Sequence, residues 1–185
     1  MPTHRPDASP VARTPRLWIV TNRVSDYVRW HRLMADDPEV SRDWSAREHE
    51  LARRVPMGPI ADPLDSPEPL MEDDPGQLFF AALDRSTRHL VGGVTVDAGE
   101  LGGAVHRDYR AQGYGHEMLT AVCDLAHHRF GIARLTAGCE ATNVPSQRWL
   151  TKAGFTLTDR RDPYTYGNGR VIHPLWWTKL DPSAE

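Results

Sequence analysis

Cysteine, lysine and long apolar runs are all scarce in this sequence of 185 residues. The two cysteines, Cys123 and Cys139, fall inside predicted regular elements, so a disulfide framework is excluded and a reducing compartment is expected. No run is apolar enough to span a bilayer, and residues 1–15 lack the apolar core of a secretory signal. We therefore expect a cytoplasmic protein without a membrane partner, whose residues 1–15 form a disordered lead-in.

Several chemical signatures are also missing. The nine histidines include no HExxH pattern, no CxxC pair is present, and the adjacent His127 and His128 point in different directions on a helix, so no metal site is expected. The net charge of −3 argues against nucleic acid as a partner. The length fits a single domain, which we place at residues 16–181.

The apolar pattern that is present predicts an α+β fold, in which a mixed, largely antiparallel sheet carries helices on both faces. Strands are expected over 16–20, 77–83, 89–97, 100–106, 134–139, 155–159 and 171–180. Helices are expected over 26–35, 41–55 with Ser41 as its cap, 113–130, and between Pro145 and Gly154. Short turns at 85–88 and 98–99 indicate that three of the strands form an antiparallel meander.

The segment 56–76 interrupts this pattern with six prolines and six acidic residues that have no basic neighbour. Such a long loop is either functional or irregular, and a solvated surface loop is the simpler interpretation. The alternative is that its carboxylates line a binding site together with Trp30 and Trp44, which would favour a cationic or aromatic ligand.

The most informative stretch is 100–119, which predicts a strand, a turn with the pattern Arg110-x-x-Gly113-x-Gly115, and a helix. Free N–H groups at a helix N-terminus suit phosphate oxygens, and the glycines let the backbone approach a ligand closely. A Walker A loop is excluded because no Gly-Lys-Ser or Gly-Lys-Thr occurs. A dinucleotide fingerprint is excluded because Met118 stands at its third glycine position. A plain structural turn remains the alternative.

A second motif, at 143–155, narrows these alternatives. Asn143-Val144-Pro145-Ser146 followed by Ala153-Gly154-Phe155 resembles the Asn-x-x-Ser…Ala-Gly-Phe helix of the GNAT superfamily of acyl-CoA-dependent N-acyltransferases. The turn at Arg110 is similar to the pyrophosphate loop of that superfamily, Arg/Gln-x-x-Gly-x-Gly/Ala. Glu100-Leu101-Gly102 resembles the Glu-Ile-Gly strand start of the ribosomal-protein-alanine acetyltransferase (RimJ/RimL-like) subfamily. The resemblance is specific over 77–180.

This resemblance implies acetyl-CoA as the cofactor and a cleft between two splayed central strands. The pantetheine arm would pair with the backbone of Ala104, Val105 and His106, much as an added strand would. The motif that begins at Arg110 would bind the pyrophosphate through the N–H groups of Gln112, Gly113, Tyr114 and Gly115, with His116 nearby. Asn143 matches the position that hydrogen-bonds the pantetheine.

Amine acetylation needs a base, because an alkylamine is mostly protonated at neutral pH. Glu100 is the first candidate, ahead of Asp97 and His106, and the alternative is a solvent-facing carboxylate at a strand end. A backbone N–H near Val105 would stabilise the oxyanion. No tyrosine occurs between 143 and 155, so Ser146 is the candidate proton donor to the sulfur; alternatively it is an ordinary first-turn serine.

The sequence thus predicts an N-acetyltransferase that uses acetyl-CoA by direct transfer in a ternary complex. The acceptor is expected to be a primary amine, either of a metabolite or antibiotic or of a protein N-terminus. We favour the small molecule slightly, because the first half of the chain departs from the family. The competing hypothesis is a non-catalytic acyl-CoA-binding or interaction module, in which Glu100 and Ser146 would be incidental. A homodimer is left open.

Overall fold

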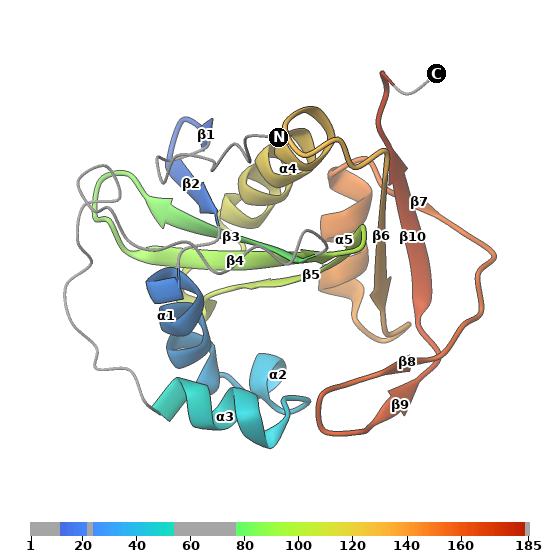
Figure 1. Ribbon diagram of the computed structural model, residues 1–185, viewed down its shortest axis with the longest axis horizontal. Coiled ribbons are helices and arrows are strands. Elements are labelled where there is room, and N and C mark those ends of the chain that lie inside the picture. Colours follow the sequence, from blue (N-terminus) through green and yellow to red (C-terminus); the bar gives the residue numbers. More distant parts are fainter. Residues whose placement is uncertain (1–11, 22–23, 54–76, 184–185) are drawn as a thin grey trace, which may run out of the picture.

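The computed structural model describes residues 12–21, 24–53 and 77–183, and the proline-rich segment 56–76 lies outside these ranges. An eight-stranded sheet runs through the molecule in the order β1-β2-β3-β4-β5-β6-β10-β7 (Figure 1). Its strands are β1 Ala12–Arg13, β2 Leu17–Thr21, β3 Gln77–Asp84, β4 Leu90–Asp97, β5 Glu100–Val105, β6 Arg134–Cys139, β7 Thr156–Leu157 and β10 Leu175–Leu180. Neighbouring strands are antiparallel, except for β5 and β6, which are parallel.

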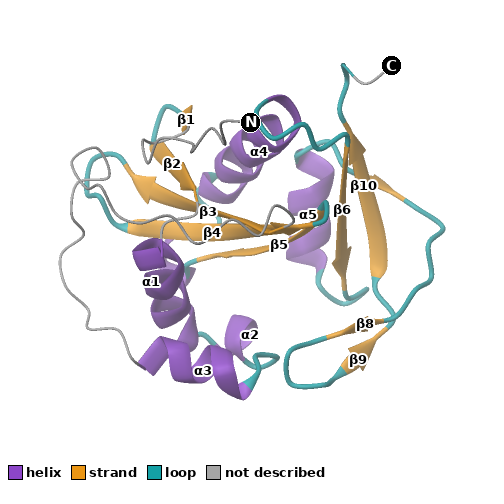
Figure 2. Cartoon of the chain, in the orientation of Figure 1, coloured by secondary structure: helices purple, strands orange, loops and turns teal. Residues whose placement is uncertain are grey.

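Helices cover both faces of the sheet, as predicted (Figures 1 and 2). Helices α4 Tyr114–His128 and α5 Val144–Lys152 lie on one face. Helices α1 Val24–Ala35, α2 Pro38–Ser41 and α3 Ala46–Arg53 form a layer on the other face. The predicted meander is confirmed, because β3, β4 and β5 pair consecutively and antiparallel. Residues 12 and 13, expected in the lead-in, instead form β1.

The helix expected over 41–55 begins later than predicted: it is α3 Ala46–Arg53, Ser41 belongs to the separate helix α2, and residues 54–55 lie outside the described ranges. Ser41 does not cap a helix; it ends α2, and its hydroxyl donates to the carbonyl oxygens of Ala35 and Asp37. The cap of α3 is Ser45, whose N–H and hydroxyl both donate to Glu48 Oε2 at 2.7 Å. The Glu48 N–H returns a bond to Ser45 Oγ, which completes a capping box.

The strand expected over 171–180 is also interrupted. Val171–Ile172 forms β9, and β10 begins only at Leu175, after Pro174, which lacks the N–H that a continuous ladder needs. The turn-rich segment before β9 contains another short strand, β8 Tyr164–Thr165, which pairs with β9 as a separate hairpin. The strand expected over 155–159 is reduced to the two residues of β7.

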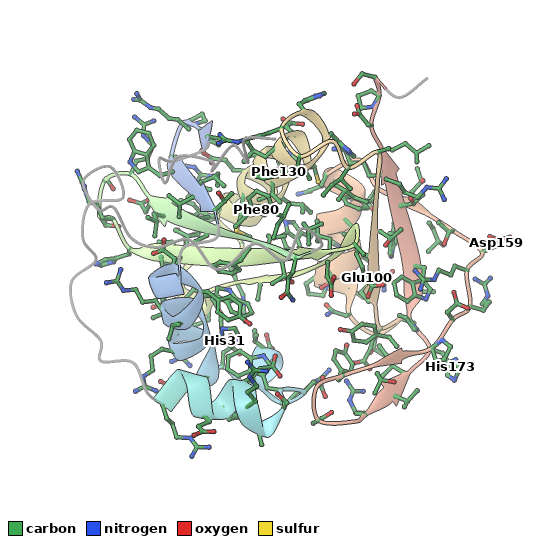
Figure 3. All side chains as sticks on the ribbon, in the orientation of Figure 1. His31, Phe80, Glu100, Phe130, Asp159 and His173 are labelled. Carbon is green, nitrogen blue, oxygen red and sulfur yellow. The ribbon has the colours of Figure 1, made fainter. Side chains whose placement is uncertain are left out.

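The apolar alternation of the sheet creates two cores. On the α4 and α5 face, Phe80 and Phe130, both labelled in Figure 3, meet edge to face, and their ring centroids are 5.7 Å apart. Both cysteines are buried, and burial raises the pKa of the Cys123 thiol to about 12. The tandem tryptophans point to opposite faces: Trp177 enters this core, and Trp176 lies on the other face under Arg160.

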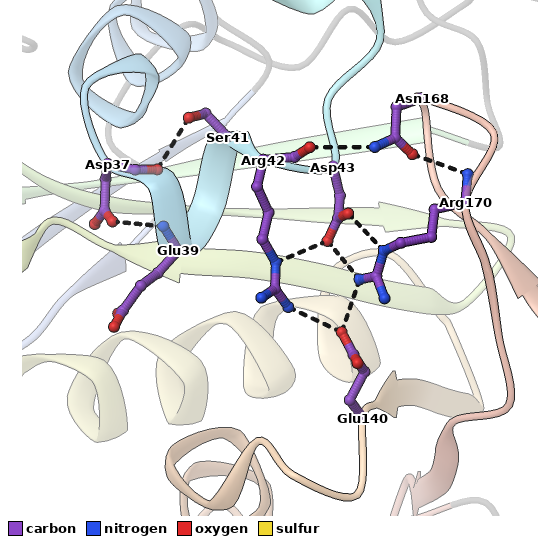
Figure 4. A network of polar contacts seen from close by, with 8 residues as sticks. All are labelled: Asp37, Glu39, Ser41, Arg42, Asp43, Glu140, Asn168 and Arg170. Atoms are coloured by element: carbon purple, nitrogen blue, oxygen red, sulfur yellow. Dashed lines mark hydrogen bonds and ion pairs between the residues drawn. The ribbon is translucent and has the colours of Figure 1, made fainter.

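A network of charged side chains joins the turn between α2 and α3 to the β8–β9 hairpin (Figure 4). Arg170 donates two 2.7 Å bonds to the Asp43 carboxylate and a third to Glu140, at the end of β6. Arg42 bonds the same two carboxylates at 3.2 and 2.9 Å. The Asn168 side chain also donates to the Arg42 carbonyl oxygen. Two segments more than 120 residues apart in sequence are thereby held together.

We expect Gly93→Ala to lower the free energy of unfolding by about 1–3 kcal/mol, because overpacking costs this much in a filled core. A Cβ at Gly93 would lie 2.6 Å from Trp30 Cδ1 and 2.8 Å from Phe79 Cε2. The matched control is Gly102→Ala on the same sheet face, where the nearest atom is Thr95 Oγ1 at 3.4 Å. Urea unfolding measures both variants, and equal effects would contradict the packing explanation.

We expect Arg170→Gln to lower the melting temperature at pH 7. Hydrogen bonds from Arg170 hold the pKa values of Asp43 and Glu140 below their ordinary range, so the stabilisation is present above about pH 4. It is lost as the pH falls through the lowered pKa values and the carboxylates become protonated. The difference between wild type and variant should therefore narrow in acid. Arg148→Gln, at an exposed α5 position, controls for the loss of surface charge.

Candidate functional site

The two central strands separate almost as soon as they meet. Strands β5 and β6 share a single bridge, between Glu100 and Thr136, and the Thr136 N–H donates to the Gly99 carbonyl oxygen at 2.8 Å. Beyond this pair, no residue of β5 is paired with β6 in the described part of the chain. The splayed pair of strands expected from the resemblance is therefore present.

The direction of the β5 main chain decides which groups face this opening. The His106 N–H donates to the Val91 carbonyl oxygen at 2.8 Å, so His106 and Val91 form a hydrogen-bonded pair in the β4–β5 register. Because such pairs alternate along an antiparallel ladder, Ala104 also directs its main-chain groups to β4. The intervening residues Gly103 and Val105 direct theirs to the open side. Sequence reasoning named Ala104 and His106 and missed Gly103.

The turn after β5 presents a row of main-chain donors. A short 3₁₀ helix, Arg107–Tyr109, leads into a turn in which Ala111 has φ +59° and Gly113 has φ +84°. The N–H groups of residues 112–116 make no hydrogen bond to any described residue. They lie at the start of α4, where the helix dipole adds partial positive charge. This arrangement is suited to an anion.

Most of the side chains predicted in this turn already have partners. Arg110 Nε donates to the Val105 carbonyl oxygen at 3.0 Å, and its remaining nitrogens pair with Asp37 and Glu39 at the start of α2. The Tyr114 hydroxyl donates to Asp84 at 2.7 Å. The Gln112 amide donates to the Asp108 carbonyl oxygen at 2.6 Å. These side chains shape the turn, and the main chain carries the free donors.

Arg16, which sequence reasoning missed, lies against the same turn from the start of β2. Its Nε donates to Glu117 Oε2 at 2.7 Å, its Nη1 donates to the Gln112 carbonyl oxygen at 2.9 Å, and its guanidinium covers the Tyr114 ring. Nη2 lies 3.2 Å from where a Cβ on Gly113 would stand. A lone arginine before a short strand gives no sequence signal for this contact.

Helix α5 is fixed to the first turn of α4. The Trp149 indole N–H donates to the Gly115 carbonyl oxygen at 2.6 Å, which joins the two predicted motifs. Asn143 is the N-cap of α5 and accepts the Ser146 N–H at 3.1 Å. The Ser146 hydroxyl has no hydrogen-bond partner among the described residues. His116, in the first turn of α4, is likewise without one in the described ranges.

Glu100 lies on the face opposite α4, beside the junction of β5 and β6 (Figure 3). Its strand neighbour Leu101 enters the α4 core, whereas Glu100 shares a face with Ala104, which packs near Trp30 under α1. Arg160 Nη1 lies 3.9 Å from Glu100 Oε2. No contact joins Glu100 to Ser146 among the described residues.

The surroundings of Glu100 favour a proton on its carboxyl. Half-burial raises the pKa of Glu100, Arg160 opposes this effect, and Asp97 adds to it. Burial and the nearby carboxylates of Glu100, Glu48 and Asp97 raise the pKa of Tyr164. Tyr164 and Arg160 were missed from sequence because they follow β7, outside both motifs.

Trp30 and Trp44, which the alternative interpretation placed in a binding site with the acidic loop, are core residues, and the loop itself lies outside the described residues. Their ring centroids lie 6.0 Å apart in a buried aromatic cluster with His31, which Figure 3 labels. Burial lowers the pKa of His31. In the described ranges, no helix is long and apolar enough to cross a membrane, and no three His, Cys, Asp or Glu side chains gather at one point.

Comparisons with known proteins agree with this geometry. A family model described as an acetyltransferase (GNAT) domain matches residues 16–156. An uncharacterized N-acetyltransferase, YjdG, from Bacillus subtilis (strain 168) is 34% identical over 67 residues, which cover 36% of this chain and 40% of that protein. The aligned part is therefore less than half of that relative's length.

Solved structures share the fold at low identity. A ribosomal-protein-S5-alanine acetyltransferase from Vibrio fischeri is 12% identical with a TM-score of 0.67, covering 94% of this chain and 98% of that one. An acetyltransferase from Agrobacterium tumefaciens str. C58 is 17% identical with a TM-score of 0.58, covering 92% and 94%. The family model spans most of the chain, and the α+β fold contains a sheet that splays between β5 and β6 beside a row of free N–H donors. This chain therefore belongs to the GNAT family of acetyltransferases.

Proposed function

We propose that the protein transfers the acetyl group of acetyl-CoA directly to a primary amine. The observation that carries this proposal is the position of Glu100, on the same strand as the open main-chain groups of Gly103 and the open Val105 N–H but on the opposite sheet face from α4. A carboxylate there can approach an acceptor from one side while a cosubstrate occupies the other. Family membership supports acetyl-CoA as that cosubstrate.

The described residues fit acetyl-CoA in three respects. Gly103 and the Val105 N–H offer unpaired main-chain groups of the kind that a pantetheine amide can join, whereas the Val105 carbonyl oxygen already accepts from Arg110. The free N–H groups of 112–116 suit its diphosphate. Helix α5, which Asn143 caps, is joined to the first turn of α4 by the bond from Trp149 to Gly115.

The proposed chemistry assigns one task to each group of this chain. Acetyl-CoA supplies an acetyl thioester, whose carbonyl carbon an unprotonated amine attacks; the new C–N bond replaces the C–S bond, and CoA leaves through its sulfur. Glu100 accepts the proton of the amine at a carboxylate oxygen, directly or through water. The Val105 N–H faces the opening and is the proposed donor to a carbonyl oxygen held there. The Ser146 hydroxyl, which has no partner among the described residues, is the proposed donor to the sulfur.

The acceptor is proposed only as a primary amine, either a small molecule or a protein N-terminus. A thiol-release screen over peptides, polyamines, aminoglycosides and amino acids tests the whole proposal. Acetyl-CoA should raise the melting temperature of both an enzyme and a non-catalytic binding module. Only an enzyme releases CoA in proportion to an amine, so stabilisation without turnover across the screen would favour the binding module.

We expect Glu100→Gln to lower kcat/KM at neutral pH by about 10²- to 10⁴-fold, the range that a general base contributes. In the wild type, kcat/KM should fall as the pH drops through the raised pKa of Glu100, and the variant should lack this acidic limb. The control is the affinity for acetyl-CoA measured by isothermal titration. It should be the same in wild type and variant, because Glu100 lies on the other face of the sheet from the turn. Unchanged kcat/KM in the variant would exclude Glu100 as the base.

We expect Gly115→Ala to weaken acetyl-CoA binding by about tenfold, or about 1.4 kcal/mol. The new Cβ would stand 3.2 Å from Val105 Cγ2 and 3.3 Å from Trp149 Nε1, narrowing the space between β5 and α5. Alanine favours a helix, so folding should survive. Gly131→Ala, beyond the other end of α4, meets no atom within 4 Å but has φ +68°, so it should cost stability without altering acetyl-CoA binding, and it is the binding control. An unaltered Kd in Gly115→Ala would contradict the assignment of this gap to the cosubstrate.

A further inference from the structure

Arg160, in the connection between β7 and β8, is held firmly in place. Its guanidinium stacks on the Trp176 ring, with 3.5 Å between the guanidinium carbon and the ring centroid. Its Nε donates to Asp162 Oδ2 at 2.7 Å. The Trp176 indole N–H donates to the Asp162 carbonyl oxygen at 2.8 Å, which fixes the ring relative to the same loop. The stack and the two bonds leave Nη1 directed at β5.

The group that Nη1 faces is the Glu100 carboxylate, 3.9 Å away. This is the one ion pair that Glu100 makes in the described part of the chain. The other charged group close to Glu100 is Asp97, its direct partner in the β4–β5 register. Tyr164 approaches from β8 as a neutral phenol. Arg160 therefore favours the ionised form of Glu100, whereas the acidic neighbour Asp97 and partial burial disfavour it.

We propose that Arg160 is a positioning residue that keeps the Glu100 carboxylate ionised and oriented beside the acceptor. The inference rests on the proposed role of Glu100 as the base, and it adds a residue that neither sequence motif contains. Arg160 touches neither acceptor nor cosubstrate in this assignment; it acts through Glu100.

The balance of charges around Glu100 gives the direction of the effect. Burial raises the pKa of Glu100 most, Arg160 lowers it, and Asp97 raises it. Without Arg160 the two raising effects act unopposed, so Glu100 should hold its proton to higher pH. We expect a rise of about 1 pH unit, at the low end for an opposite charge at this distance, because both side chains are more than a third exposed.

Arginine suits this position better than lysine would. Its flat guanidinium can stack on Trp176 while separate N–H edges reach Asp162 and Glu100. A lysine ammonium keeps the charge but loses the flat stack and the fork of donors. Arg160→Lys should therefore shift the titration of Glu100 less than Arg160→Gln does.

The direct test is a pH titration of the Glu100 carboxyl carbon by NMR in the full chain with labelled glutamate, assigned by comparison with Glu100→Gln. The midpoint should rise in Arg160→Gln, rise less in Arg160→Lys, and fall in Asp97→Asn, which removes the acidic neighbour. Arg161→Gln is the matched control, because this adjacent arginine makes its described bond only to the Arg160 carbonyl oxygen. An unchanged midpoint in Arg160→Gln, or a rise in Asp97→Asn, would overturn the inference.

Kinetics with an amine from the screen separates this inference from the proposed function. In Arg160→Gln the acidic limb of kcat/KM should move to higher pH by the same amount as the carboxyl midpoint, and activity should recover at alkaline pH. A loss at every pH would mean a structural role and would overturn the inference. If Glu100→Gln is fully active, the proposed base fails, whereas the NMR titration still reports on Arg160. If Arg160→Gln does not fold, the opposite shifts in Arg160→Lys and Asp97→Asn decide the outcome.

Discussion

The site depends on one constraint: buried main-chain groups need hydrogen-bond partners, and β5 loses its partners on one side after Glu100. A strand that diverges from its neighbour leaves donors and acceptors exposed unless another chain or ligand pairs with them. Here these groups belong to Gly103 and to the Val105 N–H, in the middle of an eight-stranded sheet, whereas the Val105 carbonyl oxygen already accepts from Arg110.

The two faces of the sheet contribute different groups around this opening. On one face, α4 and α5 supply the row of free N–H groups and the capped helix start, joined by the bond from Trp149 to Gly115. On the other face, Glu100 lies beside Arg160 and Asp97. The network around Arg170 fastens the turn between α2 and α3 to the β8–β9 hairpin and to Glu140 at the end of β6.

Sequence patterns predicted the strands and helices that have strong periodicity and clear end signals. The meander, the helix after Gly113 and the helix between Pro145 and Gly154 all follow from local chemistry. A single local signal is not enough to place a helix start: Ser41 resembles a cap, but Ser45 with Glu48 forms the complete capping box. Beyond Leu157, apolar alternation predicts one strand over 171–180, and Pro174 divides it.

For the site, the glycine pattern located the turn, but the alternation of the β5 ladder determines which main-chain groups are free, and that needs the register with β4. Arg16 and Arg160 reach the site from distant segments, and spacing along the chain cannot reveal such contacts. Their ion pairs, with Glu117 and Glu100, form only in the folded chain.

Arg110 has a consequence that reaches beyond the shape of its turn. One guanidinium bonds the end of β5 through Val105 and the start of α2 through Asp37 and Glu39, so it crosses from one layer of the molecule to the other. The turn before α4 and the start of α2 are thereby linked. A shift of one relative to the other would stretch the same three bonds, so the two layers keep a common alignment.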